Sequence, residues 1–388
     1  MIKRMLHPMV QMTMKAHLKS KNKSWSLGND KKTNLYFNNY LGCVYQINNN
    51  VVLILNKKQM TFRNSNIFDI VEKKLNNFYL VGYLSYNFND SRSSKDYRAI
   101  FNIYTKPDSK LFSQIEINRS LKNTFSFKSK SSDQHFIKLI RKAKKLIEKG
   151  EIYQINLTRQ FLYNHTKDTY PLFLNYFKSQ PVEYGAFIDF FDHSIVSGSM
   201  ELFLQKKGIK VQTKPIKGTS DNKTKNLDKN SKERAENLMI VDLMRNDLSK
   251  ICEAGTVKVN SLFNKKKYTT LTQLESTISG KLKNKIKLKE IFNRTMPPGS
   301  VTGTPKVKSI EIISKMENHT RGPYCGAVGY ISPNNDFCFS VGIRLSKISK
   351  NKKTFYTGSG IVWDSDPKKE NIESHLKARA FLNTLSSS

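Results

Sequence analysis

The chain places its strand-like segments in runs, and this ordering restricts the fold more than any other feature of the sequence. Four short segments with strand character follow one another between residues 184 and 212, and three more lie between 326 and 358. An Asn-rich turn at 48–50 joins two further segments into a predicted hairpin. Regular alternation of one strand with one helix, which builds a doubly wound nucleotide fold, is not seen. We therefore expect an α/β protein of the α+β type, with large antiparallel sheets and helices packed outside.

Individual elements can be placed from periodicity and end signals. The predicted strands are 44–47, 51–55, 78–84, 152–158, 184–190, 194–197, 203–205, 210–212, 326–331, 337–345 and 354–358. The predicted helices are 133–149, 232–250, 289–294, 305–316 and 367–385. The first helix has a Ser132 or Asp133 cap and ends at Gly150, while Leu238 and Val241 are expected in the core stripe of the second.

The charge is unusual, because 66 Lys and Arg residues face 31 Asp and Glu residues, a formal net charge of +35. A nucleic-acid-binding protein is one interpretation, but no zinc-finger spacing or aromatic RNA-binding signature accompanies the charge. A Lys- and Asn-rich composition spread over a solvated surface is the other, and it is favoured. A positive field would still attract a small dicarboxylate or an acidic partner.

Cellular location is limited by what the sequence lacks. None of the four cysteines stands at C-x-x-C spacing, which favours reduced thiols in a cytoplasmic protein. The basic segment at 1–29 has no apolar core of the secretory type, and no apolar run is long enough for a membrane span. We expect neither membrane nor nucleic acid among the partners.

Two predicted helices each carry a pair of glutamates three residues apart, Glu233 with Glu236 and Glu370 with Glu373. Residues at this spacing share a helix face. Acids near a helix start are ordinary, and Glu373 can simply pair with Lys377 four residues later. Two such faces could also hold one Mg²⁺, which prefers oxygen ligands and keeps several waters. The residues permit this site without establishing it.

Three further segments could contact a ligand. The Gly-rich loop at 296–304 opens a helix and could present backbone N–H groups to an anion, and Gly358–Gly360 could approach a ligand closely. Neither has the spacing of a nucleotide-binding loop. Lys217, in the segment KPIKGTS, would usually be an exposed loop charge, but a desolvated lysine near other cations becomes a nucleophile.

Taken together, these segments resemble the chorismate-utilising enzymes, which include anthranilate, aminodeoxychorismate, isochorismate and salicylate synthases. The resemblance runs from about 132 to 382 through GEIYQINLTR, KPIKGTS, KERAENLMIVDLMRNDLSKIC, PPGSVTGTPKVKSIEII, RGPYCGAVGYIS, FSVGIRLS and GSGIVWDSDPKKENIESHLKARAFL. It implies two large β-sheets packed together with helices outside. Residues 1–125 would form the variable N-terminal part of this fold, and 126–388 the chorismate-binding catalytic region.

The resemblance also implies roles for individual residues. Glu236 and Glu373 resemble the family's Mg²⁺ ligands, with Glu233 and Glu370 in support. Glu201 resembles the general acid that protonates the departing 4-hydroxyl of chorismate. The implied substrate contacts are Gln154, Thr219, Tyr324, Arg344, Gly358, Ser359, Gly360 and Lys377.

Two positions select the reaction. Water-using members of the family carry a lysine where this chain has Gln154, and an amide cannot act as a base. Anthranilate synthases usually have alanine where this chain has Lys217, whereas aminodeoxychorismate synthases have lysine. The resemblance therefore implies amination of chorismate at C4, with anthranilate formation as the alternative. Met200, where the family usually has proline, and Gln273, where anthranilate synthases often have histidine, are departures.

A source of ammonia is the remaining expectation. The chain contains no segment with a cysteine nucleophile elbow typical of glutamine hydrolysis. We therefore expect a separate glutamine amidotransferase subunit as a partner, or free ammonia. The chain is also too short to include the lyase that would complete 4-aminobenzoate, so the expected product is aminodeoxychorismate for folate synthesis.

Overall fold

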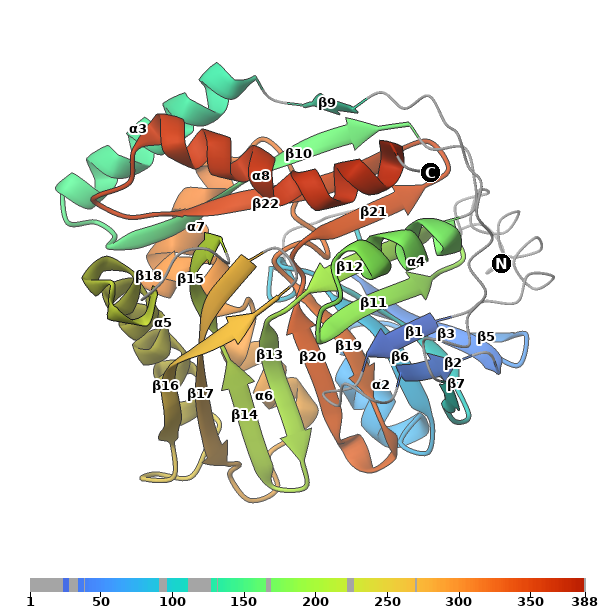
Figure 1. Ribbon diagram of the computed structural model, residues 1–388. Helices are drawn as coiled ribbons and strands as arrows, with labels where there is room; N and C mark the ends of the chain where they lie inside the picture. The colour runs from blue at the N-terminus through green and yellow to red at the C-terminus, as the bar shows by residue number, and fades with distance from the viewer. Residues whose placement is uncertain are drawn as a thin grey trace.

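The computed structural model describes residues 24–27, 34–37, 39–90, 96–110, 127–130, 132–164, 169–221, 227–268 and 271–386. Two large antiparallel sheets dominate it and lie one above the other in Figure 1. This arrangement confirms the predicted fold class. None of the described helices is long and apolar enough to cross a membrane.

Sheet A is the upper sheet of Figure 1. Its strands, in order across the sheet, are β18 (Gly303–Thr304), β10 (Gln154–Tyr163), β22 (Lys353–Ile361), β21 (Leu345–Ser349), β12 (His193–Ser199), β11 (Tyr184–Asp189), β1 (Ser24–Leu27), β2 (Asn34–Phe37) and β8 (Asp108–Lys110). A short strand, β9 (Phe127–Ser129), pairs with β10.

Sheet B lies below sheet A in the same view. Its order is β15 (Ile216–Asp221), β17 (Leu271–Lys281), β14 (Lys210–Lys214), β13 (Leu202–Lys207), β20 (Phe337–Val341), β19 (Ala327–Ile331), β6 (Tyr79–Leu84), β7 (Ala99–Tyr104), β3 (Tyr40–Ile47), β4 (Asn50–Leu55) and β5 (Lys58–Phe62). Strand β16 (Lys258–Lys267) pairs with β17. Because β6 pairs with β19, strands from both sides of residue 125 build this sheet.

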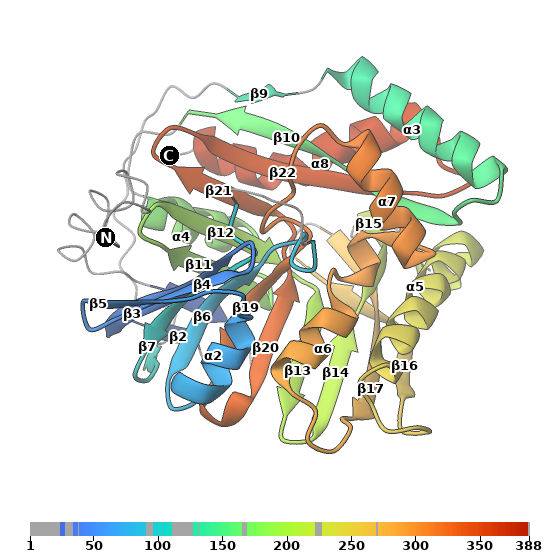
Figure 2. The ribbon, with the colours of Figure 1, turned by 180° about the vertical axis from the view of Figure 1, so that it is seen from behind.

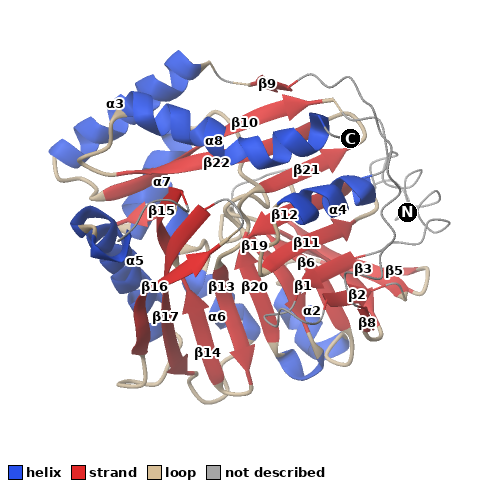
Figure 3. Cartoon of the chain, in the orientation of Figure 1, coloured by secondary structure: helices blue, strands red, loops and turns tan. Residues whose placement is uncertain are grey.

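Seven α-helices lie in the described part of the chain, and Figures 1 and 2 show them around the sheets. They are α2 (Ile67–Lys74), α3 (Asp133–Glu148), α4 (Thr169–Ser179), α5 (Ser231–Ser249), α6 (Leu288–Thr295), α7 (Lys306–Met316) and α8 (Pro367–Ser386). Short 3₁₀ turns occur at Leu227–Lys229, Gly299–Val301 and Pro333–Asn335. Helices α3, α4 and α8 cover sheet A, whereas α2 and α6 cover sheet B (Figure 3).

Helix α3 forms where its capping residues and the spacing of its apolar residues predict a helix. The Ser132 side chain accepts a hydrogen bond from the His135 N–H, and Gly150 adopts a positive φ of 71° just after the helix. Phe136, Ile140 and Ala143 are buried on one face. Capping and amphipathic spacing therefore position this helix over sheet A.

Two sequence predictions are wrong in an informative way. The strand expected over 337–345 is two strands, β20 in sheet B and β21 in sheet A, and the chain crosses between the sheets at 342–344. Arg344 has a positive φ of 50° at this crossing, a conformation that an unbroken strand cannot contain. Leu238, expected in the core, is 44% exposed on the outer side of α5.

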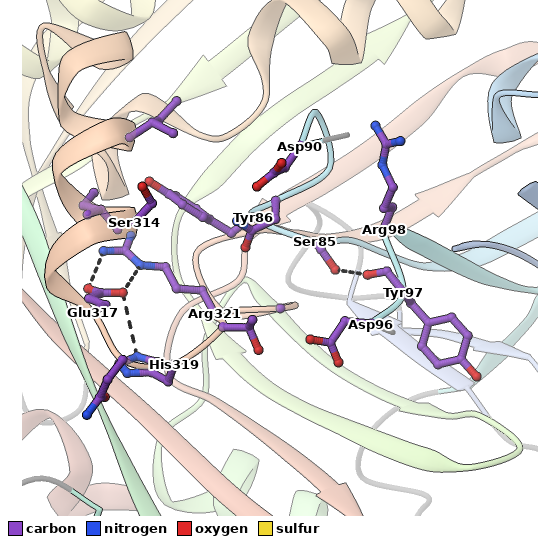
Figure 4. Close-up of a pocket in the computed structure, with 16 residues that line it drawn as sticks. Ser85, Tyr86, Asp90, Asp96, Tyr97, Arg98, Ser314, Glu317, His319 and Arg321 are labelled. Atoms are coloured by element: carbon purple, nitrogen blue, oxygen red, sulfur yellow. Dashed lines mark hydrogen bonds and ion pairs between the residues drawn. The ribbon is translucent and has the colours of Figure 1, made fainter. Parts of the chain in front are cut away.

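A buried ion pair between Glu317 and Arg321 connects segments that are far apart in the sequence (Figure 4). Both carboxylate oxygens of Glu317 bind the Arg321 guanidinium, at 2.8 and 2.7 Å, and both side chains are 2% exposed. Arg321 also donates to the carbonyl oxygens of Val301 and Asn156. Glu317 in turn accepts from the Thr158 N–H at 2.8 Å. The pair therefore ties the Gly-rich loop to β10.

Removing one partner should leave the other charge buried without compensation. We expect Glu317→Ala to lower the free energy of unfolding by about 3–5 kcal/mol. Glu311→Ala is the matched control, since Glu311 forms an exposed pair with Lys315 and should change stability by less than ~1 kcal/mol. Urea unfolding followed by circular dichroism measures both, and equal effects would show that the buried pair has no special weight.

Candidate functional site

The structure brings Lys217, Gln154 and Gly360 together at the edge where the two sheets meet. Lys217 lies on β15, directly opposite Leu274 of β17, and its side chain is half-buried. A methyl group added to Gly360 would lie 3.1 Å from the Lys217 Nζ and 2.9 Å from the Gln154 Nε2. The glycine therefore makes the room in which these two side chains meet.

The environment of Lys217 lowers the pKa of its amine. Burial lowers the pKa of Lys217, and the positive charge of Lys377 lowers it further. The carboxylates of Glu236, Glu201 and Glu373 oppose the shift, with Glu236 the strongest of them. The burial effect is the largest, so the amine loses its proton more readily than an exposed lysine does.

Glu201 has the complementary property of holding a proton. It follows β12 and is 5% exposed, and burial raises its pKa to about 7. Hydrogen bonds from the Ser300 side chain and the Ile216 backbone, and the charge of Lys217, oppose this shift. A carboxyl group with this pKa is present in both protonation states near neutral pH, as a general acid requires.

The first glutamate pair faces the lysine strand from α5. Asn230 caps the helix by accepting a hydrogen bond from the Glu233 N–H at 3.2 Å. A methyl group added to Gly218, whose φ is +77°, would lie 2.9 Å from the Glu233 Oε2. Glu236, one turn further along, acts on the charge of Lys217. Both glutamates therefore lie on the side of α5 that faces β15.

The second pair lies at the start of α8, above the same region. Glu373 pairs with Lys377 at 2.6 Å, and Lys377 also donates to the Gly358 carbonyl at 2.8 Å. Glu370 accepts from the Ser365 hydroxyl at 2.8 Å. Burial raises the pKa of Glu370, and the negative charge of Glu373 raises it further. The two carboxylates therefore repel each other, a condition that a bound cation would relieve.

The carboxylates of this region suit Mg²⁺ better than a metal ion that is bound entirely by protein side chains. Within the described residues, no group of three or more His, Cys, Asp or Glu side chains is arranged to hold a metal ion. Mg²⁺ commonly uses one or two carboxylates together with waters and substrate oxygens. Glu236 and Glu373 come from different helices and both act on Lys217, so they are the residues that would hold such an ion.

The remaining predicted contacts are Tyr324, Arg344, Ser359 and Thr219. The ring of Tyr324 stacks on Tyr356 at 5.1 Å, and its hydroxyl lies 3.1 Å from the position of a methyl group added to Gly358. Arg344 lies at the crossing between the sheets, where its Nη1 donates to the Lys377 carbonyl at 3.4 Å. The Ser359 hydroxyl donates to the carbonyl of Glu370 and also hydrogen-bonds to the Glu370 carboxyl group. The side chain of Thr219 lies outside the described residues.

Two residues near Glu201 were not predicted from the sequence. Ser300 hydrogen-bonds to Glu201, although the Gly-rich loop that contains it was interpreted as an anion-binding loop. Glu275, 3% exposed on β17, raises the pKa of Glu201 by its charge. The signal for Glu275 was a charged residue in an otherwise strand-like segment, which is rare in buried positions.

Comparison with known proteins agrees with this geometry. Residues 45–383 match the chorismate binding enzyme family. Aminodeoxychorismate synthase component 1 of Bacillus subtilis is 34% identical over 269 residues, which is 67% of this chain and 57% of that protein. Anthranilate synthase component 1 of Saccharolobus solfataricus is also 34% identical, over 257 residues, 64% of this chain and 61% of that protein. The matched region thus spans about three fifths of these relatives.

A solved structure extends the likeness over the whole fold. Anthranilate synthase component I from Streptococcus pneumoniae has a TM-score of 0.77, with 22% identity and 97% of both chains covered. At 22% identity, this match is evidence only that the two proteins share a fold. With the family match over 45–383 and the site assembled by β10, β15, β22, α5 and α8, the chain belongs to the chorismate binding enzyme family.

Proposed function

We propose that this chain converts chorismate and ammonia to 4-amino-4-deoxychorismate, as component 1 of an aminodeoxychorismate synthase. The observation that carries the proposal is the pairing of Lys217 with Glu201 in one site. Burial disfavours the charged form of each, which shifts the Lys217 amine and the Glu201 carboxyl group toward their neutral forms. A covalent displacement at chorismate needs this combination.

The proposed chemistry divides one difficult displacement into two easier ones. The Lys217 amine attacks C2 of chorismate, both ring double bonds shift, and the 4-hydroxyl departs with a proton from Glu201 as water. Ammonia then attacks C4, both double bonds shift back, and the Lys217 amine leaves C2. Arg344 and Lys377 would hold the substrate carboxylates. A bound Mg²⁺ would neutralise negative charge on a carboxylate.

Anthranilate formation is the second candidate, since relatives with both names match at the same identity. It requires ammonia to attack C2, the atom that Lys217 would occupy. Gln154, against Gly360, has no basic nitrogen and so gives no support to a reaction with water. Lys217 therefore favours amination at C4.

Product identification tests the proposal. The purified chain, incubated with chorismate, Mg²⁺ and an ammonium salt, should give aminodeoxychorismate as the main product in chromatography with mass detection. Anthranilate as the main product would establish the second candidate. With glutamine in place of ammonium, product should form only after a glutaminase subunit is added, because component 1 relatives take their name from a divided enzyme.

The metal proposal gives a separate expected result. Glu236→Gln and Glu373→Gln should each raise the Mg²⁺ concentration needed for half-maximal activity by about tenfold or more, because each removes a negatively charged oxygen ligand. Glu253→Gln is the control, since Glu253 forms an exposed pair with Lys281. A Mg²⁺ titration of activity measures the change. Unaltered titrations in both variants would exclude these glutamates as ligands.

Gly360 should tolerate no side chain. In Gly360→Ala the new methyl group would press on the Lys217 Nζ and the Gln154 Nε2, at 3.1 and 2.9 Å. A displacement of about 1 Å at a reacting atom can lower kcat by about 10²-fold. Steady-state kinetics should show this loss, whereas Gly208→Ala, at a glycine with no neighbour within 4 Å, should retain activity and report only the cost of its positive φ.

A further inference from the structure

Two carboxylates share one ammonium group where β16 and β17 meet the start of β11. The Lys266 Nζ on β16 binds the Glu183 Oε1 at 2.6 Å and lies 3.7 Å from the Glu275 Oε1. Glu183 directly precedes β11 of sheet A, whereas Lys266 and Glu275 belong to sheet B. The cluster therefore joins the two sheets, and with all three groups ionised it has one negative charge in excess.

A small apolar core places this cluster next to Glu201. Its three buried members are Val182, Met200 and Ile216. The first two precede Glu183 and Glu201 in the chain, and the third lies opposite Glu275 in the pairing of β15 with β17. The three carboxyl groups therefore lie around one apolar core. Glu201 and Glu275 are 5% and 3% exposed, so little water screens their charges from each other.

Strand pairing connects Glu275 to Glu201 on one side and to Lys266 on the other. The Ile216 backbone hydrogen-bonds to the Glu201 carboxyl group, and Ile216 pairs with Glu275 across β15 and β17. Paired residues of antiparallel strands have their Cβ atoms about 4.5–5.5 Å apart. On the other edge of β17, Lys266 pairs with Gln273 and reaches Glu275 along the diagonal. Glu275 therefore lies between Lys266 and the residue that holds Glu201.

The titratable groups around Glu201 differ in their effect on its proton. Lys217 favours the ionised form of Glu201, and Glu275 favours the protonated form. The Tyr268 hydroxyl and the Cys325 thiol also interact with Glu201. Burial raises the pKa of both groups well above neutrality, so neither is charged near pH 7. Of these four groups, Glu275 is therefore the one whose charge keeps the proton on Glu201.

The charge of Glu275 depends in turn on its own neighbours. Lys266 and Lys214 favour its ionised form, whereas burial and the charge of Glu183 oppose ionisation. Burial raises the pKa of the adjacent Tyr184, which is therefore neutral. Glu183 holds Lys266 at 2.6 Å, against 3.7 Å for Glu275, and so takes the larger share of its positive charge. Glu183 thereby limits how far Lys266 neutralises Glu275.

We propose that Glu275 is a positioning residue of the reaction and acts through Glu201. Its negative charge, which Glu183 protects from full neutralisation by Lys266, keeps the Glu201 carboxyl group protonated until the 4-hydroxyl of chorismate departs. The inference rests on the proposed function, in which Glu201 is the general acid. It assigns the protonated state of that acid to a charge cluster outside the predicted substrate contacts.

The pH dependence of kcat/KM separates this electrostatic role from a structural one. Glu275→Gln keeps the shape of the side chain but removes its charge, so the decline of kcat/KM with rising pH should begin at a lower pH. At pH 8 the variant should be about threefold or more slower than the parent, and at pH 6 within about twofold of it. Glu275→Asp keeps the charge and should retain the parent profile. An unshifted profile in Glu275→Gln would overturn the proposal.

Glu183→Gln tests the part assigned to Lys266. With Glu183 neutral, Lys266 is left to neutralise Glu275, so the profile should shift in the same direction as in Glu275→Gln. The matched control is Glu253→Gln, because Glu253 forms an exposed pair with Lys281 at the far end of β17 and should leave the profile unchanged. A parent profile in Glu183→Gln would contradict the division of charge between the two carboxylates.

Carbon-13 NMR of the whole chain, labelled at the glutamate carboxyl carbons, measures the same effect without reference to the reaction. The Glu201 signal is identified by its absence from Glu201→Gln. Its titration midpoint, expected at about pH 7 in the parent, should move to lower pH in Glu275→Gln and stay in place in Glu275→Asp. An unmoved midpoint in Glu275→Gln would overturn the inference. A moved midpoint in a chain that makes no aminodeoxychorismate would support the action of Glu275 on Glu201 and count against the proposed function instead.

Discussion

Lys217→Ala should abolish formation of aminodeoxychorismate, lowering kcat by ~10³-fold or more, as expected for loss of a covalent nucleophile. The substitution converts KPIKGTS to the alanine form typical of anthranilate synthases. Residual amination should then occur by direct attack of ammonia at C2, which expels the 4-hydroxyl as water, and loss of the enolpyruvyl group as pyruvate would then give anthranilate. Chromatography of the products, with ammonium chloride as the nitrogen source, measures both the loss and the change of product.

The control for this variant is another lysine of the same sheet. Lys210 lies exposed at the start of β14, and Lys210→Ala should leave the rate and the product unchanged. If Lys217→Ala makes aminodeoxychorismate at the parent rate, Lys217 is not the nucleophile.

Glu201→Gln should lower kcat by about 10²–10⁴-fold, the usual contribution of a positioned general acid. In the parent enzyme the protonated form is the active one, and the pKa of Glu201 is raised to about 7. We therefore expect kcat/KM to fall about tenfold per pH unit above this value, because the acid loses its proton. In the Gln variant, this dependence should be absent from the residual rate. A pH profile that keeps its shape would assign the proton to another group.

Stability separates this catalytic effect from misfolding. The folded-state pKa of Glu201 lies above the ordinary value of 4.5, so its ionisation opposes folding as the pH rises from about 4.5 to 7. That shift corresponds to roughly 3 kcal/mol above pH 7. Glu201→Gln should therefore be at least as stable as the parent at pH 8 and show no gain at pH 4. Urea unfolding at the two pH values measures the difference.

The sequence was most informative where local physics decides the outcome. Helices α3, α5, α7 and α8 lie close to their predicted ranges, because capping residues and amphipathic spacing act within a few turns. The hairpin β3–β4 also formed as expected around the turn at 48–49. The predicted site segments then came from distant positions, and the fold brings Gln154, Lys217 and Gly360 within contact of one another.

Features that depend on contacts between distant segments could not be predicted from the sequence in the same way. Alternation over 337–345 continues through Val341 and Arg344 without a break, so nothing local reveals that β20 and β21 belong to different sheets. The positive φ of Arg344 is imposed by that crossing. Leu238 lies opposite the face of α5 that bears Glu236, and its exposure reflects which side of the helix meets β15 and β17.

Charge effects inside the site also depend on the assembled fold. No spacing in the sequence indicates that Ser300 would hydrogen-bond to Glu201, or that Glu275 would act on it from β17. Ser359 is another example, because its side chain hydrogen-bonds to both the carbonyl and the carboxyl group of Glu370 at the start of α8. Both outcomes follow from which sheet face meets which helix, a choice made by packing over the whole molecule.

The central claim is that Lys217 forms a covalent bond to chorismate. Intact-mass and peptide mass spectrometry of the chain, incubated with chorismate and Mg²⁺ but without ammonia, tests it most directly. The account predicts an adduct on Lys217 with the mass of chorismate less one water, which disappears with release of aminodeoxychorismate when ammonium is added. Aminodeoxychorismate formation with no adduct on Lys217 at any time in the reaction would contradict it.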